Sequence, residues 1–279
     1  MQNNRMEKVT LSVIIAAKNE AHNIADCIAS VAFADEILVL DSGSQDATAT
    51  IAQQLRAKVV HTDWQGYGAQ QQRGIDLAQS DWVLSLDADE RISPELQLEI
   101  VRAINSPVAK GYRLPRSSSF CGQFMKAGGW TPDYTTRLVR RDCAGFTSHF
   151  LHAHMTVAGT TSDLKSPIIH YSYRNLDDVL DKLSRYSRGA AMDAATQGQT
   201  SGLGKAILKA QWAFFRTFVL RAGFLDGRMG LVLAIFNAQI TYYKYLRLHL
   251  QDAAAVNPQL PDKSHATKAV TQAAKETIS

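Results

Sequence analysis

The chain has 279 residues, of which 46% are hydrophobic and 20% charged, a balance that excludes a fibrous or wholly disordered protein. Its formal net charge of +4 and isoelectric point near 8.9 favour anionic partners such as nucleotides or phospholipid surfaces. Three cysteines lie far apart without a CxxC pair, and the N-terminal MQNNRMEKVT has no apolar signal region. Both features indicate a protein of the reducing cytoplasm.

The first hundred residues alternate short apolar runs with segments of helical periodicity. The expected strands cover 11–17, 36–40, 59–61 and 82–86, and the expected helices cover 24–31, 46–57 and 70–78. This alternation predicts an α/β fold, with a mostly parallel sheet and helices on both of its faces. Ligands of such sheets bind beyond the carboxyl ends of the strands, where we expect Asp41 and Asp87.

The fourth expected strand runs directly into carboxylates in the sequence VLSLDADE. Asp87 and Asp89 are two residues apart, and residues two apart in an extended segment point the same way. Their repulsion would be relieved by Mg²⁺ or Mn²⁺, which prefer carboxylate, phosphate and water oxygens. The alternative is a solvated acidic turn that caps the helix expected from Pro94 to Asn105.

Residues 110–173 mix glycine, proline, aromatic residues and histidine with short β-prone runs. This irregular pattern predicts a half of the domain that shapes a second substrate site, since variable loops carry specificity. The spacing of apolar residues from Leu176 to Leu183 then predicts another amphipathic helix.

Residues 205–250 are rich in aromatic and basic side chains and contain one acid, Asp226. The longest uncharged run, 229–243, is shorter than the ~20 apolar residues that a spanning helix needs. The pattern therefore predicts amphipathic helices that lie in a membrane interface. The alternative is a helical hairpin packed on the α/β domain or in a dimer. Residues 251–279 are polar and predict a disordered tail.

Several motifs resemble those of family 2 glycosyltransferases with the GT-A nucleotide-sugar-binding fold. They read LSVIIAAKNE, VLDSGSQDAT, TDWQGYGAQQQRG and VLSLDADERISPEL. The later stretches GGWTPDYTTRLVRRD, IIHYSYRN and VLRAGFLDGRMGLVLAIFNAQITYYKY are similar to the lipopolysaccharide-core β-glucosyltransferases that act on inner-core heptose. The resemblance covers about residues 11–248.

The resemblance implies a domain organisation. Residues 1–10 form an N-terminal extension, and residues 11–200 form the GT-A domain. That domain divides into a nucleotide-binding half, 11–107, and an acceptor half, 108–200. Residues 201–250 form the membrane-associating segment, and residues 251–279 form the tail.

The resemblance also implies roles for donor-site residues. Asp41 would contact the nucleotide base, with Ala17 and Glu20 nearby. Asp87 would contact the ribose and Asp89 would hold the metal, Mg²⁺ or Mn²⁺, with Ala88 between them. Arg73 would reach the diphosphate, because a guanidinium offers paired donors, although it could also be a surface arginine. His170 matches the position of an additional metal ligand, although a lone histidine is often structural.

The implied reaction is inverting transfer, in which a base removes a proton from the attacking acceptor hydroxyl. Relatives carry a histidine followed by an acid in the segment that here reads FLHAHM. His152 matches the histidine, but Ala153 replaces the acid and cannot accept a proton. Either His152 or His154 takes over, or Asp133 serves as base, or the protein transfers slowly or not at all. Trp130 and Asp133 would face the acceptor, although Trp130 could equally belong to the core.

The leading hypothesis is an enzyme that moves glucose from UDP-glucose onto the lipopolysaccharide core. It would be cytoplasmic and peripheral on the inner face of the inner membrane, and it would have no nucleic-acid partner. One alternative is a catalytically impaired sugar-nucleotide-binding scaffold at the membrane, which the alanine at position 153 favours. Another is a glycosyltransferase for a different cell-surface glycan.

Overall fold

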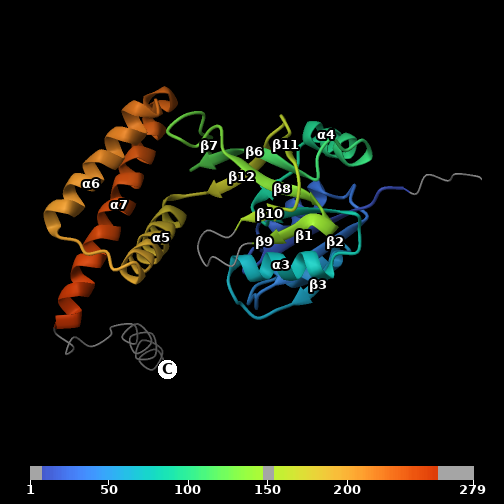
Figure 1. Cartoon of the computed structure of the whole chain (residues 1–279), viewed down its shortest axis with the longest axis horizontal. Helices are drawn as coiled ribbons and strands as arrows, with labels where there is room; N and C mark the ends of the chain where they lie inside the picture. The colour runs from blue at the N-terminus through green and yellow to red at the C-terminus, as the bar shows by residue number, and fades with distance from the viewer. Residues whose placement is uncertain (1–7, 147–153, 257–279) are drawn as a thin grey trace, which may run out of the picture. The chain divides into compact units, whose positions relative to one another are not determined.

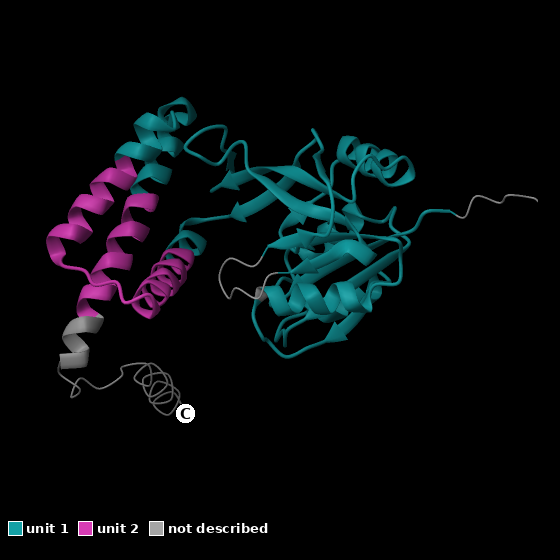
Figure 2. Ribbon diagram, viewed as in Figure 1, with its two compact units in different colours: residues 1–180, 215–235 teal, residues 181–214, 236–279 magenta. Residues whose placement is uncertain are grey.

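The computed structural model describes residues 8–146 and 154–256 of the chain (Figure 1). It divides into two compact units (Figure 2). The first comprises Met1–Leu180 and Phe215–Ile235, and the second comprises Asp181–Phe214 and Phe236–Ser279. Residues 1–7, 147–153 and 257–279 lie outside the described residues, and with them most of the predicted extension 1–10 and of the predicted tail 251–279. The first six residues of that tail, 251–256, are helical, because the last helix of the structure continues to Val256. The predicted domain boundaries remain predictions.

The first unit is built on one large sheet. Its elements are β1 (Leu11–Ala17), α1 (Ile24–Ser30), β2 (Glu36–Asp41), α2 (Thr48–Gln54), β3 (Lys58–His61), α3 (Tyr67–Leu77), β4 (Trp82–Asp87), β5 (Glu90–Arg91), α4 (Pro94–Asn105), β6 (Gly111–Phe120), β7 (Gln123–Phe124), β8 (Tyr134–Arg140), β9 (Ala144–Phe146), β10 (Met155–Val157), β11 (Thr161–Asp163) and β12 (Ile168–Tyr173). The strand order is β3-β2-β1-β4-β8-β6-β12-β5. The strands β3, β2, β1 and β4 are parallel to one another, as the sequence predicts.

Both faces of the parallel strands are buried under helices. Val13 and Ile15 of β1 belong to one apolar core with Ile100 of α4. Ile14, between them, belongs to a second core with Ile75 of α3. Because successive side chains of a strand point to opposite faces, a continuous apolar run such as LSVIIAA needs helices on both sides. The predicted mostly parallel sheet with helices on both faces is confirmed.

The irregular half of the sequence completes the same sheet. β8 pairs antiparallel with both β4 and β6, and β12 runs parallel to β6. The sequence of β6, GYRLPRSSSF, contains a proline and two arginines and gives no clear strand signal. Half-buried Arg116 and buried Ser118 contact residues of the site described below, so packing and not local propensity forms this strand.

Three long helices follow. They are α5 (Leu176–Thr196), α6 (Leu203–Phe215) and α7 (Gly227–Val256), and the short turns η2 (Arg216–Leu220) and η3 (Gly223–Asp226) join α6 to α7. The sequence predicted these helices, but α5 is longer than the expected 176–183. Within the second unit, Arg247 Nε of α7 donates to Ser187 Oγ of α5 at 3.2 Å. Among the described residues, no helix is both long and apolar enough to cross a membrane.

Candidate active site

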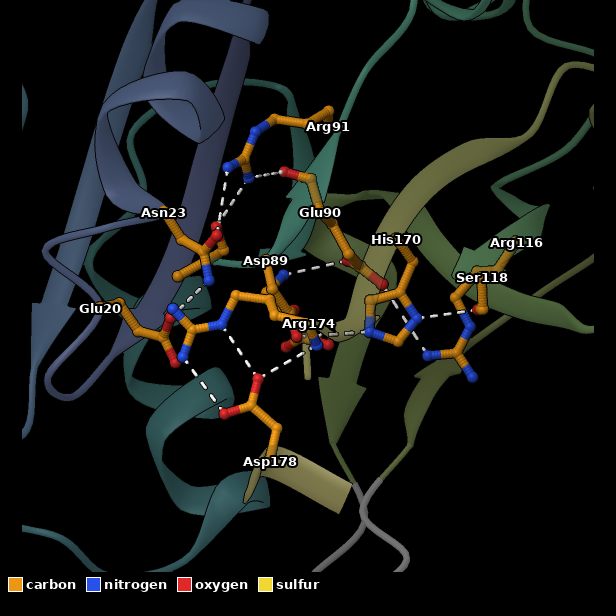
Figure 3. Close-up of polar contacts among 12 residues, drawn as sticks. Glu20, Asn23, Asp89, Glu90, Arg91, Arg116, Ser118, His170, Arg174 and Asp178 are labelled. Carbon is orange, nitrogen blue, oxygen red and sulfur yellow. Dashed lines mark hydrogen bonds and ion pairs between the residues drawn. The ribbon is translucent and has the colours of Figure 1, made fainter. Parts of the chain in front are cut away.

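Strand register brings His170 to the aspartates that follow β4. His170 of β12 lies opposite Glu90 of β5 on one side and opposite Ser118 of β6 on the other. Its Nδ1 is 2.9 Å from Ser118 Oγ, and its Nε2 is 3.5 Å from Asp89 Oδ2 (Figure 3). The side chains of His170 and Asp89 are only 14% and 22% exposed. One ring nitrogen is therefore held by a hydroxyl and the other faces a carboxylate.

Glu20 adds a second carboxylate close to Asp89. It lies in the loop after β1 and accepts a hydrogen bond from Asn23 Nδ2 at 2.8 Å (Figure 3). Burial raises the pKa of Glu20, and the negative charge of Asp89 raises it further, so the Asn23 hydrogen bond offsets only part of the shift. Two carboxylates this close together make a site that a cation would stabilise.

A buried ion network fixes the turn between β4 and β5. Arg137 Nη2 of β8 donates to Asp87 Oδ2 at 2.6 Å and to Glu90 Oε1 at 2.8 Å. Glu90 is completely buried and also accepts from the backbone N–H of Asp87 at 3.0 Å. Burial opposes ionisation of Asp87, but the adjacent Arg137 guanidinium outweighs it and lowers the pKa of Asp87. Burial raises the pKa of Glu90, which Arg137 counteracts only in part.

In this network the carboxylate of Asp87 is bound by Arg137. Its predicted contact with the ribose stays a prediction. Ala88 is buried, and its carbonyl oxygen accepts from Arg91 Nη1 at 2.8 Å, which also binds the carbonyl oxygen of Glu90 at 2.9 Å. In residues 87–90, which we name the DADE turn, Arg91 thus holds the backbone and Arg137 holds the carboxylates of Asp87 and Glu90. The carboxylate of Asp89 faces His170.

Asp133 is linked to the same network through Arg116. Arg116 donates to Asp133 Oδ2 from Nε at 2.9 Å and from Nη2 at 2.5 Å. Its Nη1 lies 3.8 Å from Oε1 of Glu90. The Asp133 side chain remains 39% exposed, so it combines a fixed position with access to solvent.

Asp41 lies at the end of β2, beside Ala17 in the strand register. Its carboxylate is almost fully buried and accepts from the backbone N–H and the hydroxyl of Ser44, and His61 Nδ1 lies 3.1 Å away. The carbonyl oxygen of Ala17 accepts from Ser42 N–H at 3.0 Å. Asp41 therefore organises the loop after β2, and its contact with a nucleotide base remains a prediction.

Arg73 of α3 has a carboxylate partner outside the DADE turn. Its Nη2 donates to Asp63 Oδ1 at 3.0 Å, in the loop before the helix. The predicted diphosphate contact of Arg73 is therefore untested, and it would require this ion pair to open or to be shared.

Arg174 is an arginine that sequence reasoning missed. It follows β12 directly, and its Nε donates to Asp178 Oδ2 of α5 at 3.0 Å. Its positive charge acts on Glu20, which is also within electrostatic reach of Asp89, and Figure 3 shows the three side chains together. The only sequence signal was its position four residues after His170, which has no meaning until β12 is known to be a strand of the sheet.

The aromatic and histidine candidates have different surroundings. Trp130 is half-buried and packs edge-on against Phe120 and at a tilt against Tyr173, with ring centroids 5.7 and 5.8 Å apart. Its position fits packing as well as acceptor contact. His154 is exposed immediately before β10. His152 and the alanine at position 153 lie outside the described residues.

The donor set suits a hard divalent cation. Within 8–146 and 154–256, no three histidine, cysteine, aspartate or glutamate side chains converge on one point. Asp89 and His170 would supply one oxygen and one nitrogen ligand, and a nucleotide diphosphate and water would supply the others. A proton on Nδ1, donated to Ser118 Oγ, would leave the lone pair of His170 on Nε2, which is the arrangement a metal-binding histidine needs.

Comparisons with known proteins agree with this architecture. Residues 12–157 match the model of the family described as Glycosyl transferase family 2. A Rickettsia felis protein described as an uncharacterized glycosyltransferase is 31% identical over 94% of this chain and 96% of its own length. The lipopolysaccharide core biosynthesis glycosyltransferase LpsC of Rhizobium meliloti is 25% identical over 91% of this chain and 97% of its own.

Two solved structures are also similar. Glucosyl-3-phosphoglycerate synthase from Mycobacterium tuberculosis, in complex with Mn²⁺, UDP and glucosyl-3-phosphoglycerate, is 26% identical over 41% of this chain and 45% of that chain, with a TM-score of 0.34. TarS from S. aureus is 15% identical over 88% of this chain and 92% of that chain, with a TM-score of 0.44.

Proposed function

We propose that this chain, which belongs to glycosyl transferase family 2 and has the GT-A fold, transfers glucose from UDP-glucose to the heptose of the lipopolysaccharide inner core with inversion. The observation that carries the proposal is the pair formed by Asp89 and His170 at the carboxyl end of the parallel strands, with Ser118 fixing the imidazole. Ligands of α/β sheets bind at this end. LpsC, a lipopolysaccharide core glycosyltransferase by its name, supports the class of acceptor.

Asp89 and His170 hold Mg²⁺ or Mn²⁺ in this proposal. The cation neutralises part of the charge on the diphosphate and so makes UDP a better leaving group. Glu20 supports the cation electrostatically, because its carboxylate lies close enough to Asp89 to add negative charge to the same site. Asp41, Ala17 and the DADE turn form the floor on which the nucleoside lies.

Arg174 provides the second positive charge for the departing diphosphate. It lies on the Glu20 and Asp89 side of the site, whereas Arg73 is paired with Asp63. A guanidinium can bind two phosphate oxygens at once, and its interaction strengthens as charge builds up in the transition state. Asp178 holds Arg174 in place before the donor binds.

Asp133 is the general base of this proposal. Arg116 connects the carboxylate of Asp133 to Glu90 of the DADE turn. The partial exposure of Asp133 would allow an acceptor hydroxyl to reach it. His152 and His154 remain the alternatives, because they flank the alanine that replaces an acid in the related motif. Trp130 would present its ring to a sugar of the acceptor.

The proposed place of action is the cytoplasmic side of the inner membrane, with residues 205–250 at the membrane surface. This location follows from an acceptor that is anchored in lipid. A catalytically impaired donor-binding scaffold is the second candidate, favoured by the alanine at position 153.

The test is release of UDP from a panel of UDP-sugars with truncated, heptose-bearing lipopolysaccharide, with mass analysis of the acceptor. The proposal expects one hexose added from UDP-glucose. Donor binding without turnover, restored by Ala153→Glu, would favour the scaffold, and turnover only with a different acceptor would favour another surface glycan.

A further inference from the structure

The segment from Phe215 to Ile235, which we name the tip, carries apolar side chains on its surface although it belongs to the unit that contains the sheet. It includes η2, η3 and the first turns of α7. Its large exposed apolar residues are Phe215, Val219, Leu220, Phe224, Leu225, Leu231, Val232 and Ile235. Leu225 is 71% exposed and Leu220 is 58% exposed. So many exposed apolar side chains in one short segment are typical of an interaction surface.

The charges of the tip all have one sign at the surface. Arg216, Arg221 and Arg228 are exposed, and Lys126 lies exposed in the loop that the tip contacts. The one acid of the tip, Asp226, is buried, so it does not offset them. Apolar side chains among arginines, without an exposed acid, complement a surface with negative groups above an apolar layer.

This pattern disfavours a second copy of the chain as the partner. A symmetric dimer places the same patch on both subunits, so the arginines of one tip would face those of the other. Like charges placed together in an interface are unfavourable. A bilayer with anionic headgroups avoids that cost, because phosphates meet the arginines and acyl chains meet the leucines.

The tip is firmly joined to the loop that leads to the acceptor side of the site. The carboxylate of Asp226 accepts from the backbone N–H groups of Lys126 and Ala127, each at 2.9 Å. The carbonyl oxygen of Arg221 accepts from Gly128 N–H, also at 2.9 Å. Hydrogen bonds to a buried carboxylate are among the stronger ones, so they anchor the loop to the tip.

Two glycines allow this close packing. A side chain at residue 230 would place its Cβ only 1.8 Å from the carbonyl oxygen of Gly223, so the first turn of α7 packs against η3 only because Gly230 has no side chain. At Gly129, with φ of +85°, a Cβ would lie 2.3 Å from Nη1 of Arg221. Trp130 is the next residue in the chain, and Asp133 follows it after Thr131 and Pro132.

We propose that the tip inserts Leu220, Phe224 and Leu225 into the surface of an anionic bilayer, with its arginines on the lipid phosphates, and thereby holds the acceptor loop 123–133 at the membrane. The insertion itself does not depend on the reaction. Its benefit for a lipid-anchored acceptor rests on the proposed function.

The test is co-sedimentation of the full-length protein with vesicles of phosphatidylglycerol and phosphatidylethanolamine, beside vesicles of phosphatidylcholine. Leu220→Glu/Leu225→Glu is expected to lower the partition coefficient at least about tenfold, because two inserted leucines are lost. Arg216→Gln/Arg228→Gln should weaken binding to the anionic vesicles and reduce its salt dependence, because only Arg221 and Lys126 of the four exposed cations remain. Circular dichroism checks that each variant is folded.

Matched controls place the charge elsewhere. Leu98→Glu/Val108→Glu changes two exposed apolar residues near α4 and should keep wild-type binding. Leu203→Glu/Leu208→Glu changes exposed leucines of α6 in the second unit and should reduce binding far less than the tip variant. Equal loss in the α6 variant would overturn the assignment to the tip.

Three further results would overturn the proposal: no binding of the wild type to anionic vesicles, unchanged binding of the tip variant, or a wild-type dimer that the tip variant dissociates. Turnover of UDP-glucose with a water-soluble core oligosaccharide, measured on the same samples, keeps the two proposals separate. Retained turnover without vesicle binding defeats the tip alone, and vesicle binding without turnover on any acceptor defeats the proposed function alone.

Discussion

The imidazole Nε2 of His170 lies 3.5 Å from the carboxylate of Asp89, while its Nδ1 lies 2.9 Å from the hydroxyl of Ser118. Eighty-one residues separate the two side chains in the sequence, and the pairing of β5 with β12 brings them together. In the proposed function this pair would supply a cation with one oxygen and one nitrogen ligand.

Substitution at this pair should remove the metal site. We expect Asp89→Asn and His170→Ala each to weaken Mn²⁺ binding in the presence of UDP by at least about a hundredfold, and Ser118→Ala to weaken it about tenfold through the orientation of the ring. Electron paramagnetic resonance of bound Mn²⁺ measures this directly. Unchanged binding in His170→Ala would remove His170 from the metal shell.

The contributions of Arg174 and Arg73 to departure of the diphosphate can be distinguished by the effect of each substitution on kcat. Arg174→Ala should lower kcat about a hundredfold, because a cation that acts on developing charge is lost, and Arg174→Lys should recover part of it. Arg73→Ala should change kcat by less than about threefold, since its guanidinium is bound to Asp63. Steady-state kinetics with UDP-glucose decides between them, and the reverse order of effects would return the diphosphate role to Arg73.

The fold was largely predictable from the sequence, but the site was predictable only in part. The runs 11–17, 36–40 and 82–86 carry their own strand signal because both of their faces are buried. The strands β6 and β12 carry polar side chains toward the site, so their local pattern is weak. The resemblance singled out His170 as a candidate, whereas nothing pointed to Ser118, because its contact with His170 depends on the register of two strands far apart in the sequence.

The arginines were the hardest to predict for a related reason. Arg137 is nearly buried, and only its ion pairs with Asp87 and Glu90 make that burial tolerable. Nothing in the local sequence TTRLVRR distinguishes it from its exposed neighbours Arg140 and Arg141. Long-range pairing of charges has no periodic signature, so the structure is needed to reveal it.

The base assignment is tested by a pair of substitutions. Asp133→Asn should lower kcat at least about a hundredfold with little change in the KM for UDP-glucose, because proton removal is lost and donor contacts are kept. His154→Ala should leave kcat within about twofold. Rapid-quench measurement of a single turnover reports the chemical step. A large loss in His154→Ala with an active Asp133→Asn enzyme would move the base to the histidine segment.

Acid stability depends in part on Glu99 of α4. Its two carboxylate oxygens accept from the backbone N–H groups of Lys165 and Ser166, each at 2.8 Å. Partial burial opposes its ionisation, but these donors outweigh burial and lower the pKa of Glu99. The pKa of a glutamate in the unfolded chain is about 4.3. Because the pKa of Glu99 is lower in the folded protein, its carboxylate stabilises the fold at a pH above about 4.3, and this stabilisation is lost as the pH falls through the pKa of the folded state.

We therefore expect Glu99→Gln to reduce the free energy of unfolding by about 1–2 kcal/mol at pH 7 and by clearly less near pH 3. Urea unfolding at both pH values measures the difference. Asp181→Asn is the control, since Asp181 lies exposed on the long helix α5. An equal loss at both pH values would show that the hydrogen bonds do not depend on the charge of Glu99.

The measurement that tests the account most directly is transfer of glucose from UDP-glucose to heptose-bearing lipopolysaccharide by the full-length protein, followed with Mn²⁺, with EDTA and after Mn²⁺ is restored. If a cation held by Asp89 and His170 is required, transfer stops with EDTA and returns with Mn²⁺. Transfer is then absent in Asp89→Asn at every metal concentration. Transfer that continues in EDTA, or in Asp89→Asn at the wild-type rate, would contradict a reaction that depends on a cation held by Asp89 and His170.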